Sequence, residues 1–281
     1  MFSRLFSSKK RPFVKNWNKK IPVEINFGAG VLSMQLPEGN VSDCPTFIAD
    51  SNTSIYDRSK YQELDHLPDY ENSHMPYIPL IRAQWGLTGV FWEKFKIGEL
   101  LMSVIALRVD DLPTDKSCLN PQQFRRVLDR DMYFSFGPAN VGSYPRKVPV
   151  DWKIREINGV SWAEYSVLND IERFPDFFKE SGQEDYTKIF SVPVDDQHFI
   201  RVEFIVSGFF PLSESESKFS EMISELLATL NLELTAPIAL TSISDPREAF
   251  FWERHRLENQ TGPSGYAERK IVSLGSLPPS Y

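Results

Sequence analysis

Hydrophobic periodicity is clearest in residues 213–230, where it predicts an amphipathic helix. Six apolar residues recur there at intervals of three and four positions, which places them on one helix face: Phe219, Met222, Ile223, Leu226, Leu227 and Leu230. Ser213 and Glu216 have the spacing of a capping box at its start. A shorter helix is predicted after Asn120, a favoured capping residue, because Pro121 then takes the first helical position.

Alternation of apolar and polar residues predicts strands along much of the remaining chain. Two of these strands flank a glycine turn at 28–30, and three later runs are expected to form a meander, with Gly86-Leu87-Thr88-Gly89 as its first turn. The five runs are 23–27, 31–36, 77–85, 90–95 and 99–109.

Two further hairpins are predicted in the second half of the chain. Asn158-Gly159 is a dipeptide that type I′ turns favour, because both residues tolerate positive φ. Asp195-Asp196-Gln197 separates two more alternating runs in the same way. The strands of these hairpins are expected at 152–157, 160–168, 187–194 and 199–206.

These features together resemble the PsbP/DcrB-like superfamily, best over residues 152–232 and less closely over 23–38. The resemblance rests on Leu36-Pro37 at the end of an opening strand, the Asn158-Gly159 hairpin with Trp162, the strands around Asp195-Asp196, and Ile205-Val206-Ser207-Gly208 before the long helix. It implies an α+β fold, in which an antiparallel β-sheet is flanked by helices as an α/β/α sandwich. It also implies a binding, assembly or chaperone-like role without a shared catalytic centre, although a fold alone does not choose among such roles.

The sequence divides into four parts. Residues 1–20 form a basic and flexible arm, and residues 21–243 form the α+β domain, with a long polar insertion at 41–76. A C-terminal helix is predicted at 244–258, and the remainder, 259–281, has the Gly, Ser and Pro content of a tail.

Charge is distributed unevenly over the 281 residues, whose net charge is −7. The arm holds seven cations and no acid, so the other 261 residues carry −7 − 7 = −14. We expect no nucleic-acid partner, because phosphate binding requires clustered Lys and Arg. Aromatic residues alternate with the cations of the arm, so contact with a membrane or an acidic partner stays open for residues 1–20, beside a purely solubilising role.

Several other classes of protein are excluded by simple features. No apolar run reaches the roughly 18–20 residues of a membrane span, and the first residues lack the apolar region of a secretory signal. Cys44 and Cys118 cannot form a disulfide framework. We therefore expect a soluble, cytoplasmic protein.

Residues capable of chemistry gather at two places. His66 and His74 lie among carboxylates that could hold a divalent metal, but they lack the i, i+4 spacing of a helical metal motif, which favours a solvated loop. His198 follows Asp195 and Asp196 and could act as a general base, although Asp is common in turns for backbone reasons. With no nucleophile elbow, P-loop or complete dinucleotide fingerprint, we predict no catalytic residue, metal or cofactor.

Aromatic residues make up 13% of the chain and form two clusters, near 85–92 and 250–252. Aromatic side chains fill cores and also anchor protein interfaces, and consecutive ones on a helix cannot all face inward. The candidates for a partner surface are Trp85, Trp92, Phe251 and Trp252.

The function we expect is a non-enzymatic protein-binding, adaptor or chaperone-like module that uses its sheet and loop surfaces, the 41–76 insertion or the C-terminal helix. Its acidic body suits a basic partner surface. Two alternatives stay open: an enzyme of unrecognised class with a site in the 41–76 region, and a peripheral membrane factor that uses the basic arm.

Overall fold

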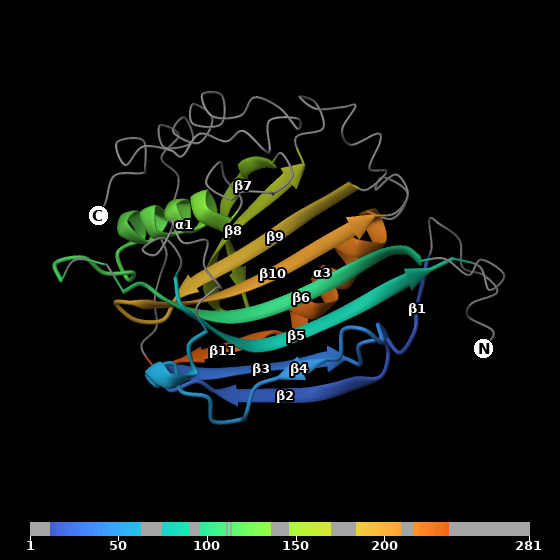
Figure 1. Ribbon diagram of the computed structural model, residues 1–281, viewed down its shortest axis with the longest axis horizontal. Coiled ribbons are helices and arrows are strands. Elements are labelled where there is room, and N and C mark those ends of the chain that lie inside the picture. The colour runs from blue at the N-terminus through green and yellow to red at the C-terminus, as the bar shows by residue number, and fades with distance from the viewer. Residues whose placement is uncertain are drawn as a thin grey trace.

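The computed structural model describes residues 12–62, 75–89, 96–110, 112, 114–135, 146–169, 184–208 and 216–235. Strands make up 53% of the described residues and helices 18%. In chain order (Figure 1) the elements are β1 (Phe13–Val14), β2 (Lys20–Asn26), β3 (Gly30–Pro37), β4 (Phe47–Ile48), the 3-10 helix η2 (Arg58–Lys60), β5 (Tyr77–Thr88), β6 (Lys96–Arg108), α1 (Pro121–Ser135), β7 (Arg146–Ile157), β8 (Val160–Asn169), β9 (Glu184–Pro193), β10 (His198–Gly208), α3 (Glu216–Thr229) and β11 (Asn231–Leu234).

The main layer is an eight-stranded antiparallel sheet in the order β1-β5-β6-β10-β9-β8-β7, with β4 also paired to β5. Strands that are close in sequence pair with one another in two groups, β5 with β6 and β7 through β10. The groups meet where β6 pairs with β10, from Arg108 opposite His198 to Gly98 opposite Gly208. This central pair forms the middle of the molecule (Figure 1).

A smaller sheet, in the order β11-β3-β2, and helix α3 together cover one face of the large sheet. The predicted apolar face of α3 is confirmed, with Phe219 and Leu226 among its buried residues. A Cβ atom at Gly98 of β6 would lie 2.9 Å from the Phe219 ring, so glycine lets the helix approach this strand closely. The resulting core runs continuously from the small sheet to the large one.

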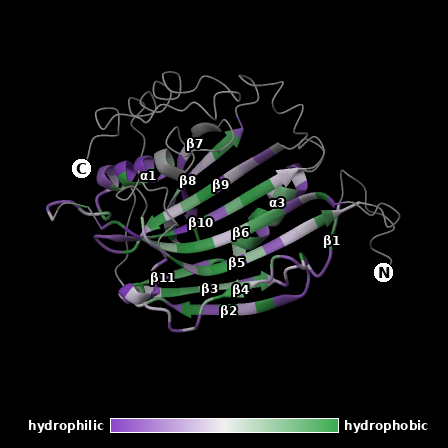
Figure 2. Cartoon of the chain, viewed as in Figure 1, coloured by the Kyte–Doolittle hydropathy of each residue, from purple (hydrophilic) through white to green (hydrophobic). Residues whose placement is uncertain are grey.

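Helix α1 packs on the opposite face of the large sheet, over a second core. Its Phe124 ring meets Phe199 of β10 edge to face, with ring centroids 5.6 Å apart. The predicted cap is confirmed, because the Asn120 Oδ1 atom accepts the backbone N–H groups of Gln122 and Gln123. Figure 2 shows hydrophilic residues along the visible side of α1, whereas the central strands of the sheet are largely hydrophobic.

The expected α/β/α sandwich is wrong. One face of the large sheet carries another sheet beside a single helix, and α1 is the one α-helix on the other face among the described residues. The reason lies in β2 and β3, whose alternation gives each strand one apolar side that must be buried. These strands bury it as a second sheet layer, so the fold is mainly antiparallel β.

The predicted turn at 86–89 is also wrong in its first part, because β5 continues through Gly86 to Thr88 and pairs directly with β6. Leu87 is buried in the core. The side chain of Asn40 takes the place of a neighbouring strand at Gly86: its Oδ1 accepts the Gly86 N–H at 2.6 Å, and its Nδ2 donates to the Gly86 carbonyl at 3.1 Å. The strand expected at 90–95 lies outside the described residues.

Both predicted hairpins of the second half are confirmed. Asn158 and Gly159 have φ values of 48° and 82°, as a type I′ turn requires. The Asn158 side chain also donates to the carbonyl of Leu230 at 2.5 Å, which joins this turn to the end of α3. The second turn lies between β9 and β10, at the sequence Asp195-Asp196-Gln197.

Residues 12–20, which we expected to belong to a flexible arm, pack against the fold. Val14 of β1 and Trp17 are each 7% exposed. The Trp17 Nε1 atom donates to Glu225 of α3 at 2.8 Å, and its ring meets Trp85 edge to face at 5.4 Å. Residues 1–11, the predicted C-terminal helix at 244–258 and the tail lie outside the described residues.

Candidate functional site: a groove on the large sheet

An open groove of about 810 Å³ lies on the face of the large sheet that carries α1. Its floor is made by β5, β6 and β10, and one wall is made by residues from Val41 to Phe47, from the start of the 41–76 insertion. Phe47 stands at the rim with 43% of its surface exposed. The residues that line the groove include Arg82, Gln84, Lys96, Glu99, Leu101, Ser103, Ile105, Glu203 and Ile205.

The groove follows from the pleat of the two central strands. On β10, Val202, Phe204 and Val206 face the core with α3, so Glu203 and Ile205 face the other side. On β6, the residues opposite them are Ser103 and Leu101. The same strands therefore serve the main core on one side and a mixed apolar and charged floor on the other.

A charged cluster lies at the floor, where Glu203 of β10 meets Arg201 of the same strand. The Glu203 Oε1 atom lies 2.9 Å from the Arg201 Nε atom, and the Arg201 guanidinium also forms an ion pair with Asp131 of α1. The three side chains are 7% to 12% exposed. Burial raises the pKa of the Glu203 carboxyl above its ordinary value; the Arg201 charge opposes that shift and the Asp131 charge adds to it.

The other carboxylate of the floor, Glu99, is fully engaged. Its Oε2 atom accepts a hydrogen bond from the Gln84 side chain at 2.8 Å, and its Oε1 atom pairs with Lys96. Arg82, on the neighbouring strand, is exposed and forms no ion pair with Glu203. Among the described residues, the ion-pair partner of Glu203 is Arg201 alone.

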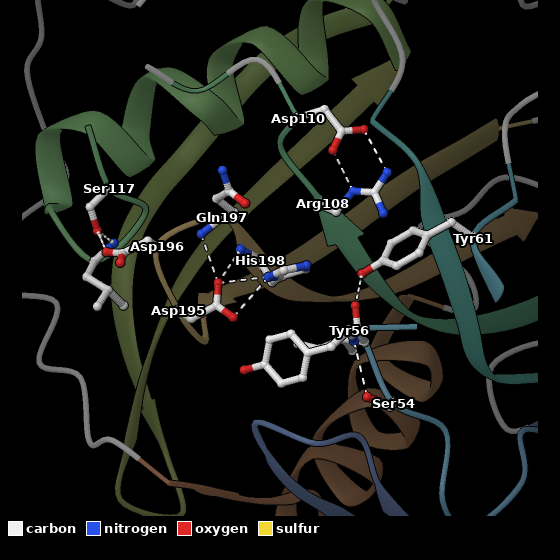
Figure 3. A network of polar contacts seen from close by, with 12 residues as sticks. Ser54, Tyr56, Tyr61, Arg108, Asp110, Ser117, Asp195, Asp196, Gln197 and His198 are labelled. Carbon is white, nitrogen blue, oxygen red and sulfur yellow. Dashed lines mark hydrogen bonds and ion pairs between the residues drawn. The ribbon is translucent and has the colours of Figure 1, made fainter. Parts of the chain in front are cut away.

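A second group of polar residues surrounds the turn between β9 and β10 (Figure 3). Asp195 accepts the backbone N–H groups of Gln197 and His198, both at 2.8 Å, and its Oδ1 atom lies 2.8 Å from His198 Nδ1. Burial acts to raise the pKa of Asp195, but these hydrogen bonds outweigh it and hold the pKa below its usual value. Asp195 is thus the acceptor that fixes the turn.

The His198 ring lies beside two tyrosine side chains, Tyr56 and Tyr61 (Figure 3). Its centroid lies 5.5 Å from that of Tyr56, edge to face, and 6.4 Å from that of Tyr61. Its Nε2 atom is buried and has no hydrogen-bond partner among the described residues. A general base must reach the proton it removes, so this geometry does not support the catalytic role that the sequence left open for His198.

The nearby nucleophiles are also held in structural roles. The Ser117 hydroxyl donates to Asp196 at 2.5 Å. Cys118 has no exposed surface, and burial raises the pKa of its thiol to about 12, so the thiol stays protonated at neutral pH. Within the described ranges, no three His, Cys, Asp or Glu residues come together as a metal site, and the segment with His66 and His74 lies outside those ranges.

Of the four aromatic candidates for a partner surface, the structure describes Trp85. Trp85 is fully buried, and its Nε1 atom donates to the carbonyl of Pro37 at 3.3 Å. It is a core residue because the N-terminal segment and the small sheet cover its side of β5. Trp92, Phe251 and Trp252 lie outside the described residues.

Sequence reasoning missed the groove, although one signal was present. Arg201 and Glu203 occupy alternate positions within the apolar run 199–206, so they had to share one face of a central strand. Two charges on one face of a buried strand require partners or a polar cavity.

Comparisons with known proteins add a weak structural likeness. No family model matches the chain, and no curated protein matches it. Among solved structures it is similar to LpqN, which is involved in cell envelope biogenesis of Mycobacterium tuberculosis, with 8% identity and a TM-score of 0.32 over 76% of this chain and 91% of LpqN. The PsbP/DcrB-like resemblance is not confirmed by these comparisons. No helix in the described part of the chain is long and apolar enough to cross a membrane.

Proposed function

We propose that the protein is a non-enzymatic binding module that holds a segment of a protein partner in the groove over β5, β6 and β10. The observation that carries this proposal is the make-up of the groove. Its floor offers apolar side chains from Leu101, Ile105 and Ile205 beside a buried carboxylate at Glu203. Partner interfaces combine apolar contact with a few placed polar groups in this way.

The shape of the groove also supports a polypeptide ligand. The groove is open to solvent, and exposed residues such as Phe47 and Arg82 stand at its edge. An extended segment can lie in such a groove and leave both of its ends free. An exposed aromatic ring at the rim suits an interface, where aromatic residues are enriched.

The polar cluster at the β9–β10 turn favours this function over an enzyme. Its nucleophiles Ser117 and Cys118 are engaged or inaccessible, and the free nitrogen of His198 is buried. Catalysis requires a base or nucleophile that reaches its substrate. The cluster instead joins the β9–β10 turn to the loop that contains Ser117, which stabilises one end of the sheet.

Blocking the groove tests the proposal. Ser103→Arg places a long side chain on the floor of the groove, whereas Ser224→Arg makes the same substitution at an exposed position of α3 on the other face of the sheet. Each tagged variant and the wild type are purified from the natural host at two salt concentrations, and co-purifying proteins are quantified by mass spectrometry. We expect a stoichiometric partner with the wild type and Ser224→Arg, and its loss with Ser103→Arg.

Circular dichroism of both variants shows whether each keeps the fold. Equal recovery of the partner with all three proteins would place its binding site elsewhere. Recovery of no partner with the wild type would contradict a stable adaptor role.

A further inference from the structure

The charges at the floor of the groove do not balance. Arg201 serves two carboxylates, Asp131 and Glu203, so one negative charge is left over when both acids are ionised. The three side chains are nearly buried, and an uncompensated charge in such a place is unfavourable. An additional cation next to this cluster would therefore be stabilised there.

Glu203 is the member of the cluster that a ligand can meet. It lines the groove, whereas Arg201 of β10 and Asp131 of α1 are not among the residues that line it. The rise in the pKa of Glu203 has burial as its main cause, and a second positive charge at close range would act against this rise, as Arg201 already does.

The surroundings of Glu203 fit a long cationic side chain. Ser103 lies directly opposite it on β6, and the apolar neighbours on that face are Ile205 of β10 and Leu101 and Ile105 of β6. Lysine and arginine carry an apolar stem and a charged end, so the stem can lie on the apolar floor while the end reaches the carboxylate.

We infer that the groove recognises a lysine or arginine side chain of the partner segment through Glu203. This inference rests on the proposed function of the groove as a peptide-binding site. It gives a molecular reason for an acidic protein to select a basic segment: the ligand supplies the second cation that the buried cluster of two carboxylates lacks.

The matched control for this inference lies outside the groove, on α3. Glu203→Gln and Glu221→Gln remove one charge each and keep the shape of the side chain. Glu221 is exposed, pairs with Lys218 and does not line the groove. Circular dichroism and thermal unfolding show whether both variants keep the fold of the wild type.

The experiment is a selection of phage-displayed random 12-residue peptides on the full-length wild type, Ser103→Arg, Glu203→Gln and Glu221→Gln. We expect the wild type and Glu221→Gln to enrich peptides with Lys or Arg beside apolar residues. For one selected peptide, the affinity should fall about tenfold or more with Glu203→Gln, the loss expected for a charge-assisted hydrogen bond. Replacing the cationic residue of the peptide by Met should lower its affinity for the wild type by a similar factor. The same replacement should leave its affinity for Glu203→Gln almost unchanged.

The possible results separate the inference from the proposed function. The cation inference would be overturned if the selected peptides required an unblocked groove but were not enriched in Lys or Arg. It would also be overturned if they bound Glu203→Gln as tightly as the wild type. Either result would leave the proposed binding of peptides in the groove standing. Selection of the same peptides by Ser103→Arg, or of none by the wild type, would overturn both.

Discussion

A single residue, Glu203, gives the folded state a preference for a bound proton. Its pKa is raised by burial above the ordinary value of 4.5, so the folded protein holds this proton more tightly than the unfolded chain does. The associated stabilisation is fully present below the unfolded pKa and is lost as the pH rises through the folded pKa. The melting temperature of the wild type, compared with that of Glu203→Gln, should therefore fall as the pH rises from about 4 to about 8.

Thermal unfolding of both proteins at several pH values measures this difference. A melting temperature of the wild type that stays constant relative to that of Glu203→Gln, or rises relative to it, as the pH rises would show that ionisation of Glu203 does not destabilise the folded state. Glu99→Gln, measured alongside, controls for the loss of a charge in the same groove.

Residues whose role is set by their near neighbours could be predicted from the sequence. Asn158-Gly159 forms its turn and Asn120 caps α1 because both act on backbone groups only a few positions away. The burial of Trp85 could not be predicted in the same way, because it depends on Trp17 and Pro37, which come from distant parts of the chain.

At the scale of elements, the N-terminal segment connects two parts of the fold, β5 and α3. Trp17 meets Trp85 of β5 and donates to Glu225 of α3. Trp17→Ala removes both contacts and leaves a cavity, so we expect a loss of about 3–5 kcal/mol in the free energy of unfolding. Trp17→Phe keeps a ring and loses the hydrogen bond, for which we expect about 1 kcal/mol from that bond alone.

Denaturation in urea gives these two free energies. A graded loss from Phe to Ala would show that packing contributes more than the hydrogen bond. Wild-type stability of Trp17→Ala would contradict a structural role for residues 12–20.

The arrangement of the strands in two sheet layers could not be predicted from sequence patterns. Alternation in residues 23–27 and 31–36 shows that each strand has an apolar side, but it does not say what covers that side. The strands of both sheets carry the same pattern, so the division into two sheets follows from tertiary packing. The groove was hidden for the same reason, since it requires strands from both halves of the chain.

At the scale of the whole molecule, we expect the net charge to affect the association rate of a ligand and the contacts inside the groove to affect its dissociation rate. The chain has a net charge of −7, which attracts a basic segment over a distance that salt screens. For a selected cationic peptide, we expect the association rate to fall as NaCl rises from about 50 to about 500 mM, and Glu203→Gln to change mainly the dissociation rate.

Surface plasmon resonance at several salt concentrations separates the two rates. If the association rate did not respond to salt, long-range attraction would play no part in binding. A Glu203→Gln variant with a changed association rate and an unchanged dissociation rate would contradict a contact that forms inside the groove.

The position of β3 between β2 and β11 has a consequence for synthesis of the protein. Strand β2 pairs with β3 soon after both are made, but the other side of β3 pairs with Asn231–Leu234. Until that segment leaves the ribosome, one edge of β3 has unpaired backbone groups, and such edges template aggregation. A nascent chain stopped before Asn231 would therefore keep this edge open, and we expect such products to depend on chaperones or to be degraded.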